Sequence, residues 1–194
     1  LLVSLSHVAV GLVFTVPGGA SAENGVTSPP LRRAAILMPF RFQLGDDLED
    51  ARASLLSAGF SIDEYHDADA NLEAFSRLTD YGVVVIFTHG GFDALSGEPF
   101  VVTGVPLAPG TQVAPGNPYF LTANVVTSYL PYRRGRYIGL RAAYFGNLSL
   151  TPSIYVFIAC HSYDSPGLLA ATGAAGSHFN VGWRGTIWTQ TGTW

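Results

Sequence analysis

Two short apolar runs with no polar alternation stand out along the chain. One occupies residues 83–90 and carries His89 near its end, and the other occupies residues 153–160 and ends on Cys160. Runs of this kind predict strands that are buried on both faces, as in a parallel sheet packed between helices. Catalytic groups in open α/β sheets gather at the carboxyl ends of the strands. If the two strands are neighbours, about 4.8 Å apart, the His89 imidazole and the Cys160 thiol lie within contact range.

Strands and helices are predicted to alternate before the first of these runs. Residues 34–40 form a buried strand with Pro39 near its end, and residues 60–65 form a shorter one. The helix between them has its expected caps and apolar face at Asp46, Asp47, Leu48, Ala51, Leu55, Leu56 and Gly59. Asn71 opens a second helix, which leads into the strand ending at His89. This alternation predicts an α/β fold with a mostly parallel sheet, right-handed crossovers and helices on both faces.

A segment rich in glycine and proline interrupts this alternation between residues 91 and 135. It predicts a β-hairpin with loops, followed by a short helix over residues 123–129. An insertion between two strands at their carboxyl ends lies over the functional edge of the sheet, so we expect it to form a lip for a substrate. Arginines and tyrosines alternate in and after this segment, a pattern more typical of a solvated hairpin with aromatic packing than of a nucleic-acid surface: Tyr132, Arg133, Arg134, Arg136, Tyr137, Arg141 and Tyr144.

The chain after Cys160 predicts one more helix and one more strand. Asp164 or Ser165 is a suitable N-cap with Pro166 just inside, so the positive end of a helix is expected near the thiol. Residues 180–183 are the expected fifth strand. No closing helix follows, and we expect sequence to be missing at the C-terminus.

Composition narrows the class of protein. A chain of 194 residues is long enough for one domain with a substantial core. The net charge of -4 argues against a nucleic-acid partner, because phosphate neutralisation needs a basic surface. The single cysteine excludes an intrachain disulfide and a cysteine-rich zinc site. His66 and His178 have no recognisable partners in the sequence, so neither a metal nor another cofactor is expected.

Residues 1–22 are apolar and end in small residues before the first acidic residue, Glu23. They predict a truncated signal peptide that lacks its positive n-region, with a membrane anchor or a strand pair of the domain as the alternatives. Residues 23–33 are rich in chain breakers and predict a linker, so that the domain starts at residue 34. A secreted or cell-surface protein holds its thiol in an oxidising setting, which suits a catalytic or protected cysteine.

The order of these motifs resembles that of the caspase-like cysteine peptidases, which include caspases, legumains, gingipains and clostripain. An apolar block precedes His89-Gly90, and a second apolar block precedes Ala159-Cys160. The segment Gly182-Trp183-Arg184-Gly185 is similar to the Gly-Trp-x-Gly segment of some bacterial gingipain-like members. The resemblance spans residues 34–188. It implies a caspase-like fold and a cysteine endopeptidase that acts on polypeptide substrates.

A dyad of Cys160 and His89 is what the resemblance implies for catalysis. Cys160 attacks the scissile carbonyl as a thiolate, and His89 protonates the leaving amine and later activates water. Backbone N–H groups of Gly90 and Cys160 hold the oxyanion. Elementary chemistry agrees, because a nearby imidazolium and a helix N-terminus both lower the pKa of a thiol. The missing Cβ of Gly90 lets the backbone come close to the substrate.

One departure from the family concerns specificity. Arginine-specific members carry an aspartate two residues before the cysteine, where this chain has Ile158. The expected substrate-binding residues are Ile158, Ala159 and Trp183, which suit an apolar or small side chain, although the acids Asp93 and Asp164 could still reach this pocket from loops.

Several other interpretations stay open. A lone Cys160 is often a small buried hydrophobe, and His89 can equally be structural. The same fold without the chemistry would be a degenerate caspase-like binding module on a cell surface. Residues 88–92 also resemble the His-Gly-Gly oxyanion loop of α/β-hydrolase esterases, but the sequence lacks the Gly-x-Ser-x-Gly or Gly-x-Cys-x-Gly elbow of that fold. His161 faces away from Cys160 if the strand continues, and is expected to be scaffold.

Overall fold

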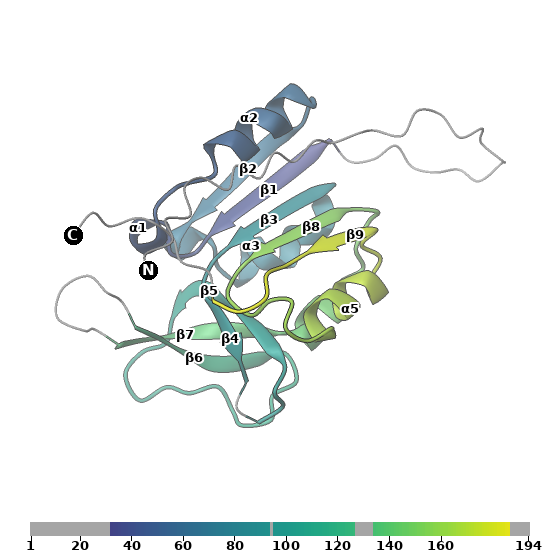
Figure 1. The fold of residues 1–194 in the computed structure, drawn as a ribbon. Coiled ribbons are helices and arrows are strands. Elements are labelled where there is room, and N and C mark those ends of the chain that lie inside the picture. The colour runs from purple at the N-terminus through teal and green to yellow at the C-terminus, as the bar shows by residue number, and fades with distance from the viewer. Residues whose placement is uncertain (1–31, 94, 127–133, 187–194) are drawn as a thin grey trace, which may run out of the picture.

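The computed structural model describes residues 32–93, 95–126 and 134–186 (Figure 1). The predicted signal peptide over residues 1–22 and all but the last two residues of the predicted linker lie outside the described residues. The first strand begins at Arg33, one residue before the predicted start of the domain. Among the helices described here, none has the length and hydropathy needed to cross a membrane.

Five parallel strands form the main sheet, in the order β2-β1-β3-β8-β9 (Figure 1). Every neighbouring pair in it is parallel. The predicted α/β class, the mostly parallel sheet and the strand near residue 180 are thereby confirmed. The strand bounds are Arg33–Met38 (β1), Ser61–His66 (β2), Val83–Phe87 (β3), Ile154–Ile158 (β8) and Phe179–Val181 (β9).

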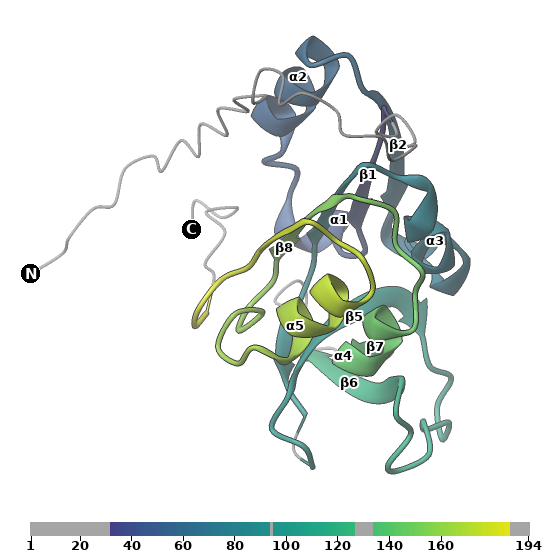
Figure 2. The same cartoon turned by 90° about the vertical axis from the view of Figure 1, so that its right-hand side faces the viewer.

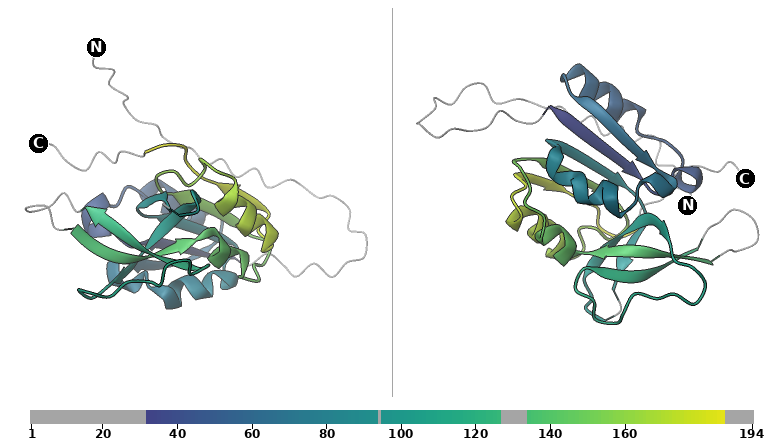
Figure 3. Two further views of the ribbon diagram at one scale, coloured as in Figure 1. Left: turned by 90° about the horizontal axis from the view of Figure 1, so that it is seen from below. Right: turned by 180° about the vertical axis from the view of Figure 1, so that it is seen from behind.

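Helices cover both faces of this sheet. One face carries α1 (Arg41–Leu44) and α2 (Glu49–Ser57). The opposite face carries α3 (Leu72–Ser76), α4 (Ala142–Gly146) and α5 (Gly167–Ala174), with the 3-10 turns η1 (Asp67–Asp69) and η2 (Arg77–Asp80) flanking α3. Helix α2 lies in front of the sheet in Figure 1, whereas α3 covers the near face in the view from behind in Figure 3.

Alternate side chains of β3 point into two different cores. Val83, Val85 and Phe87 pack in the cluster beneath α2. Val84 and Ile86 pack in the cluster beneath α3 and α5. A strand between two cores has to be apolar at every position, which explains why this run shows no alternation in the sequence.

Residues 90–141 add a second, antiparallel sheet in the order β4-β5-β7-β6. Figures 1 and 2 show it below the parallel sheet, and β4 begins three residues after the end of β3. The predicted hairpin with loops is therefore a four-stranded sheet, placed beside the carboxyl end of β3. Its strands are Gly90–Phe92 (β4), Pro99–Pro106 (β5), Phe120–Val126 (β6) and Arg134–Arg141 (β7).

The helix predicted over residues 123–129 is wrong over residues 123–126, which belong to β6, and the rest of it lies outside the described residues. Leu121, Ala123 and Val125 are buried against Phe40, whereas Asn124 between them is exposed. This is the period of two that a half-buried strand requires. The signal was present in the sequence, but the surrounding glycines and prolines obscured it.

Helix ends match the predictions in part. The side chain of Asn71 caps α3 as predicted, accepting hydrogen bonds from two backbone N–H groups of the first turn. Neither predicted aspartate caps α2, because the carboxylate of Asp46 binds two arginines instead. Leu56, predicted on the apolar face of that helix, is 60% exposed. At α5 the N-cap position is Pro166, one residue after the predicted Ser165. The Ser165 hydroxyl accepts a hydrogen bond from the backbone N–H of Gly167, the first residue of the helix.

Candidate active site

Strands β3 and β8 are neighbours, as the pairing of His89 with Cys160 requires. Their register runs in parallel from Val83 opposite Ile154 to Phe87 opposite Ile158. One residue further along, the backbone N–H of Thr88 still donates to the Ile158 carbonyl at 3.1 Å. His89 and Cys160 follow directly, so they lie at adjacent strand ends on one edge of the parallel sheet.

The backbones of these two segments touch at Gly90. A Cβ on Gly90 would overlap the carbonyl oxygen of Cys160 and lie 3.1 Å from the Cβ of Ala159. The space beside the missing Cβ, which we expected an approaching substrate to use, is therefore filled by the chain itself.

The side chain of His89 is half-buried and faces an aromatic ring. It packs edge-on against Phe40, with ring centroids 4.8 Å apart. Its Nε2 atom is buried and has no hydrogen-bond partner among the described residues, so this nitrogen does not bond to the Cys160 thiol in the structure. Burial lowers the pKa of His89 to about 4. The ring is therefore a neutral base at neutral pH, and not the imidazolium that the sequence analysis placed beside the thiol.

Cys160 is half-buried and begins a turn that carries His161 out of the strand direction. His161 has a left-handed φ of 61°, so the assumption that the strand continues through it is wrong. Its Nδ1 lies 2.5 Å from Oδ2 of Asp164, and its ring centroid lies 4.8 Å from that of Phe92. His161 is thus oriented by a carboxylate on one side and an aromatic ring on the other.

Backbone hydrogen bonds fasten this turn to the Gly-Trp-x-Gly segment. His161 N–H donates to the Gly185 carbonyl at 2.7 Å, and Tyr163 N–H donates to the Trp183 carbonyl at 2.8 Å. The Gly185 N–H donates to Asp164 Oδ1 at 2.9 Å. The bonds from His161 and Gly185 hold the pKa of Asp164 below its ordinary value. The segment singled out in the sequence is therefore fixed beside the cysteine turn.

The predicted substrate-binding residues divide between the two faces of the sheet. Ile158 and Trp183 pack against the same apolar cluster, beneath α2. The Ala159 side chain is 1% exposed and lies in the opposite cluster, beneath α3 and α5. The structure therefore brings Ile158 and Trp183 to one face, and leaves only the backbone of Ala159 for contact with a ligand.

Both acids that were considered as receptors for a basic side chain already have partners. Asp93 forms a buried ion pair with Arg141, and it also accepts hydrogen bonds from Ser96 and from the backbone of Leu95. Burial acts to raise the pKa of Asp93, but these bonds and the arginine charge hold it below the ordinary value. Asp164 is held by His161 and Gly185, as described above. Neither carboxylate offers an uncompensated charge to a substrate.

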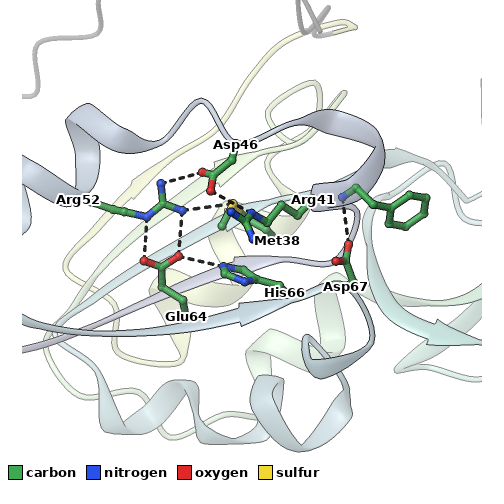
Figure 4. A network of polar contacts seen from close by, with 8 residues as sticks. Met38, Arg41, Asp46, Arg52, Glu64, His66 and Asp67 are labelled. Atoms are coloured by element: carbon green, nitrogen blue, oxygen red, sulfur yellow. Dashed lines mark hydrogen bonds and ion pairs between the residues drawn. The ribbon is translucent and has the colours of Figure 1, made fainter.

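A polar network occupies the other half of the same sheet edge, at the ends of β1 and β2 (Figure 4). The guanidinium of Arg52 donates to both oxygens of Glu64 at 2.8 and 2.9 Å and forms an ion pair with Asp46 at 2.7 Å. His66, the last residue of β2, places its Nε2 2.9 Å from Glu64. Hydrogen bonds from Arg52 and His66 keep the pKa of Glu64 below its ordinary value, against the effect of burial.

Within the described ranges, no group of three or more histidine, cysteine or acidic side chains is arranged to hold a metal ion. Comparison with models of protein families, with curated proteins and with solved structures gives no significant match. The chemistry of this edge is therefore inferred from the geometry of its residues.

Proposed function

We propose that this protein is a caspase-like cysteine endopeptidase in which Cys160 is the nucleophile and His89 the general base and acid. The observation that carries the proposal is the parallel pairing of β3 with β8, which brings an imidazole and a thiol to adjacent strand ends. The backbones of the two segments stay in contact beyond the paired strands, because Thr88 N–H donates to the Ile158 carbonyl and Gly90 packs against the carbonyl oxygen of Cys160.

The neutral state of His89 suits the role of a base. When a substrate is bound, Nε2 accepts the thiol proton, and the thiolate attacks the scissile carbonyl to form a tetrahedral oxyanion. Backbone N–H groups of Gly90 and Cys160 stabilise the oxyanion. The imidazolium then gives its proton to the departing amine, which leaves a thioester on Cys160. Water, deprotonated by the now neutral His89, hydrolyses the thioester and restores the thiol.

Nε2 is the atom to which we assign this proton, because it is buried without a partner among the described residues. Buried polar atoms of this kind are rare in folded proteins, and an orphaned one needs an explanation. Catalytic hydrogen bonds are often long in unliganded enzymes and close only when a substrate is bound. A substrate that closes the gap between the ring and the thiol supplies the missing partner.

The test is active-site labelling with a peptidyl probe that carries a thiol-reactive group. Wild type is expected to be labelled at Cys160 and Cys160→Ala to remain unlabelled, as determined by intact mass and peptide mapping. His89→Ala should be labelled at least 100-fold more slowly, because general-base catalysis typically contributes about that much or more. A small alkylating reagent applied to unfolded protein is the control, and it should label wild type and His89→Ala equally. Equal labelling of the folded proteins by the probe would overturn the dyad.

A second candidate function is a caspase-like module that binds without catalysis. It is favoured by one observation, namely that Nε2 of His89 makes no hydrogen bond to the thiol in the structure. In that case the probe reacts with folded wild type no faster than with the unfolded chain, and a bound peptide is recovered uncut. The same experiment therefore separates the two functions.

A further inference from the structure

A groove of about 400 Å³ lies on the antiparallel sheet. Phe100 from β5 and Leu121 and Ala123 from β6 line it, and loop residues including Ala114 close its side. At its rim stand two large apolar side chains that are unusually open to solvent, Phe92 at 44% and Leu95 at 73% exposure.

The floor of the groove is an aromatic ring held over two glycines. A Cβ on Gly91 would lie 3.1 Å from the ring of Phe100, and a Cβ on Gly139 would lie 3.3 Å from the same ring. The ring therefore occupies space that side chains at these two positions would fill. The result is an apolar surface inside the groove, provided by a strand that is fixed in the sheet.

The groove offers no net charge to a ligand. Among the described residues that line it, only Asp93 and Arg141 are charged, and they are paired with each other. Arg141 also donates through Nε to the carbonyl of Phe120 at 3.4 Å, so its guanidinium is further occupied. A charged side chain entering the groove would lose its hydration without meeting a counter-charge, which is unfavourable.

Two contacts connect the groove to the proposed catalytic edge. The ring of Phe92 at the rim packs against that of His161, the residue after Cys160, and β4 joins Phe92 to His89 within three residues. Leu121 and Ala123 belong to the same cluster as Phe40, whose ring packs on His89. A chain lying across the dyad can therefore place a neighbouring side chain in the groove.

We infer that this groove receives a large apolar side chain, of the size of leucine or phenylalanine, from the polypeptide substrate beside its scissile bond. The inference rests on the proposed peptidase function and extends it by giving the substrate class. A volume of about 400 Å³ is within the range of ligand pockets, and exposed apolar surface that continues into a catalytic edge is typical of a recognition site.

The test compares two variants that block the groove with one that does not. Ala114→Trp fills it from an exposed loop position, and Leu95→Glu places a charge at its rim. Leu56→Glu is the matched control, because Leu56 is a similarly exposed leucine on α2, outside the groove. Cleavage of a peptide library by wild type should favour Leu or Phe beside the scissile bond. Ala114→Trp and Leu95→Glu should lower kcat/KM for those peptides at least tenfold and cleave alanine-only peptides within about twofold of wild type.

The groove inference is wrong if both variants keep the apolar preference of wild type, or if wild type prefers charged side chains. If wild type cleaves no peptide, the peptidase proposal fails separately. The groove inference is then tested by measuring peptide binding. In that case a fluorescent Leu- and Phe-rich peptide should bind wild type and Leu56→Glu, and should lose at least tenfold in affinity for Ala114→Trp. Equal binding to all three proteins would overturn the inference.

Discussion

Two histidines stand at the carboxyl edge of one parallel sheet, and their surroundings differ. His66 ends β2 and places its Nε2 against Glu64, inside a network in which Arg52 satisfies two carboxylates (Figure 4). His89 follows β3, and its Nε2 is buried with no partner among the described residues. One half of the edge is joined by ion pairs and hydrogen bonds, whereas Nε2 of His89 in the other half makes neither kind of contact with the described residues.

This difference in hydrogen bonding suggests that the two ends of the edge have different roles, one in folding and the other in catalysis. A buried polar atom without a partner costs about 1–3 kcal/mol of folding free energy, whereas a paired one is close to neutral or favourable. A group that is retained at such a cost is a candidate for chemistry. The comparison therefore predicts that changes at the β1–β2 end affect folding, and that changes at the β3–β8 end affect catalysis.

The largest expected effect is on catalysis. His89→Phe should lower peptide cleavage at least 100-fold, because the general base is lost. The same change should raise the free energy of unfolding by about 1 kcal/mol, because a ring of similar shape replaces the unsatisfied nitrogen against Phe40. Cleavage assays and urea unfolding measure the two effects. His66→Phe is the control and should keep cleavage within about twofold of wild type; loss of folding in His89→Phe would contradict the comparison.

The next effect is on the acid sensitivity of stability. The pKa of His89 is about 4 in the folded protein and about 6.5 in an unfolded chain, so the unfolded state takes up the proton first as the pH falls. The free energy of unfolding is therefore unaffected by His89 above about pH 6.5. It falls as the pH drops from about 6.5 to about 4, and His89 adds no further loss below that. At pH 4.5 this group alone removes about 2 kcal/mol relative to pH 7.

Urea unfolding of wild type and His89→Phe at pH 7 and pH 4.5 isolates this contribution. Acidic groups such as Glu64 titrate in both proteins, so their effect cancels in the difference. The gap in stability between the two proteins should widen at pH 4.5, in favour of His89→Phe. Parallel pH curves would show that His89 is not held neutral by burial.

A loss of stability of comparable size is expected where the two candidate segments touch. Gly90→Ala should destabilise the protein by roughly 2 kcal/mol, because the new Cβ forces the Cys160 backbone away. It should also lower cleavage more than tenfold, since the same shift moves the nucleophile. Gly173→Ala, in α5 with its nearest contact at 3.7 Å, is the control and should be neutral or stabilising. Thermal unfolding measures the loss of stability, and cleavage assays measure the loss of activity. A Gly90→Ala variant with the stability and activity of wild type would contradict the packing described here.

The smallest effect is predicted at the β1–β2 end of the edge. Arg52→Met leaves Asp46 and Glu64 without their shared cation and should cost about 1 kcal/mol, because these side chains remain partly solvated. Cleavage per folded molecule should stay within about twofold of wild type. A large fall in cleavage with little change in unfolding free energy would assign a catalytic role to the β1–β2 end.

Parts of this arrangement were predictable from local patterns. The apolar runs before His89 and Cys160 correctly predicted neighbouring strands of a parallel sheet, since only a strand covered on both faces is apolar throughout. The start of α3 was predicted correctly from Asn71, because asparagine is a preferred N-cap residue. The antiparallel sheet was predicted less well, because its alternation at residues 121–125 lies within a segment rich in glycine and proline.

The partners of the polar groups were not predictable in the same way. Asp93 and Arg141 are 48 residues apart, and Asp46 was assigned to a helix cap although it binds Arg52. His161 was expected to follow the strand direction, but its left-handed backbone turns it toward Asp164. Each of these contacts depends on how distant segments pack, for which a local pattern has no signal.

The sequence by itself therefore determined the parallel sheet, its helical cover and the two neighbouring strands that precede His89 and Cys160, because burial on two faces dictates residue type at every position of a strand. Only the tertiary structure decided which of the polar groups along that edge are satisfied. A hydrogen bond joins atoms brought together by the whole fold, so the unpartnered Nε2 of His89 and the groove on the antiparallel sheet appear only once distant segments are packed.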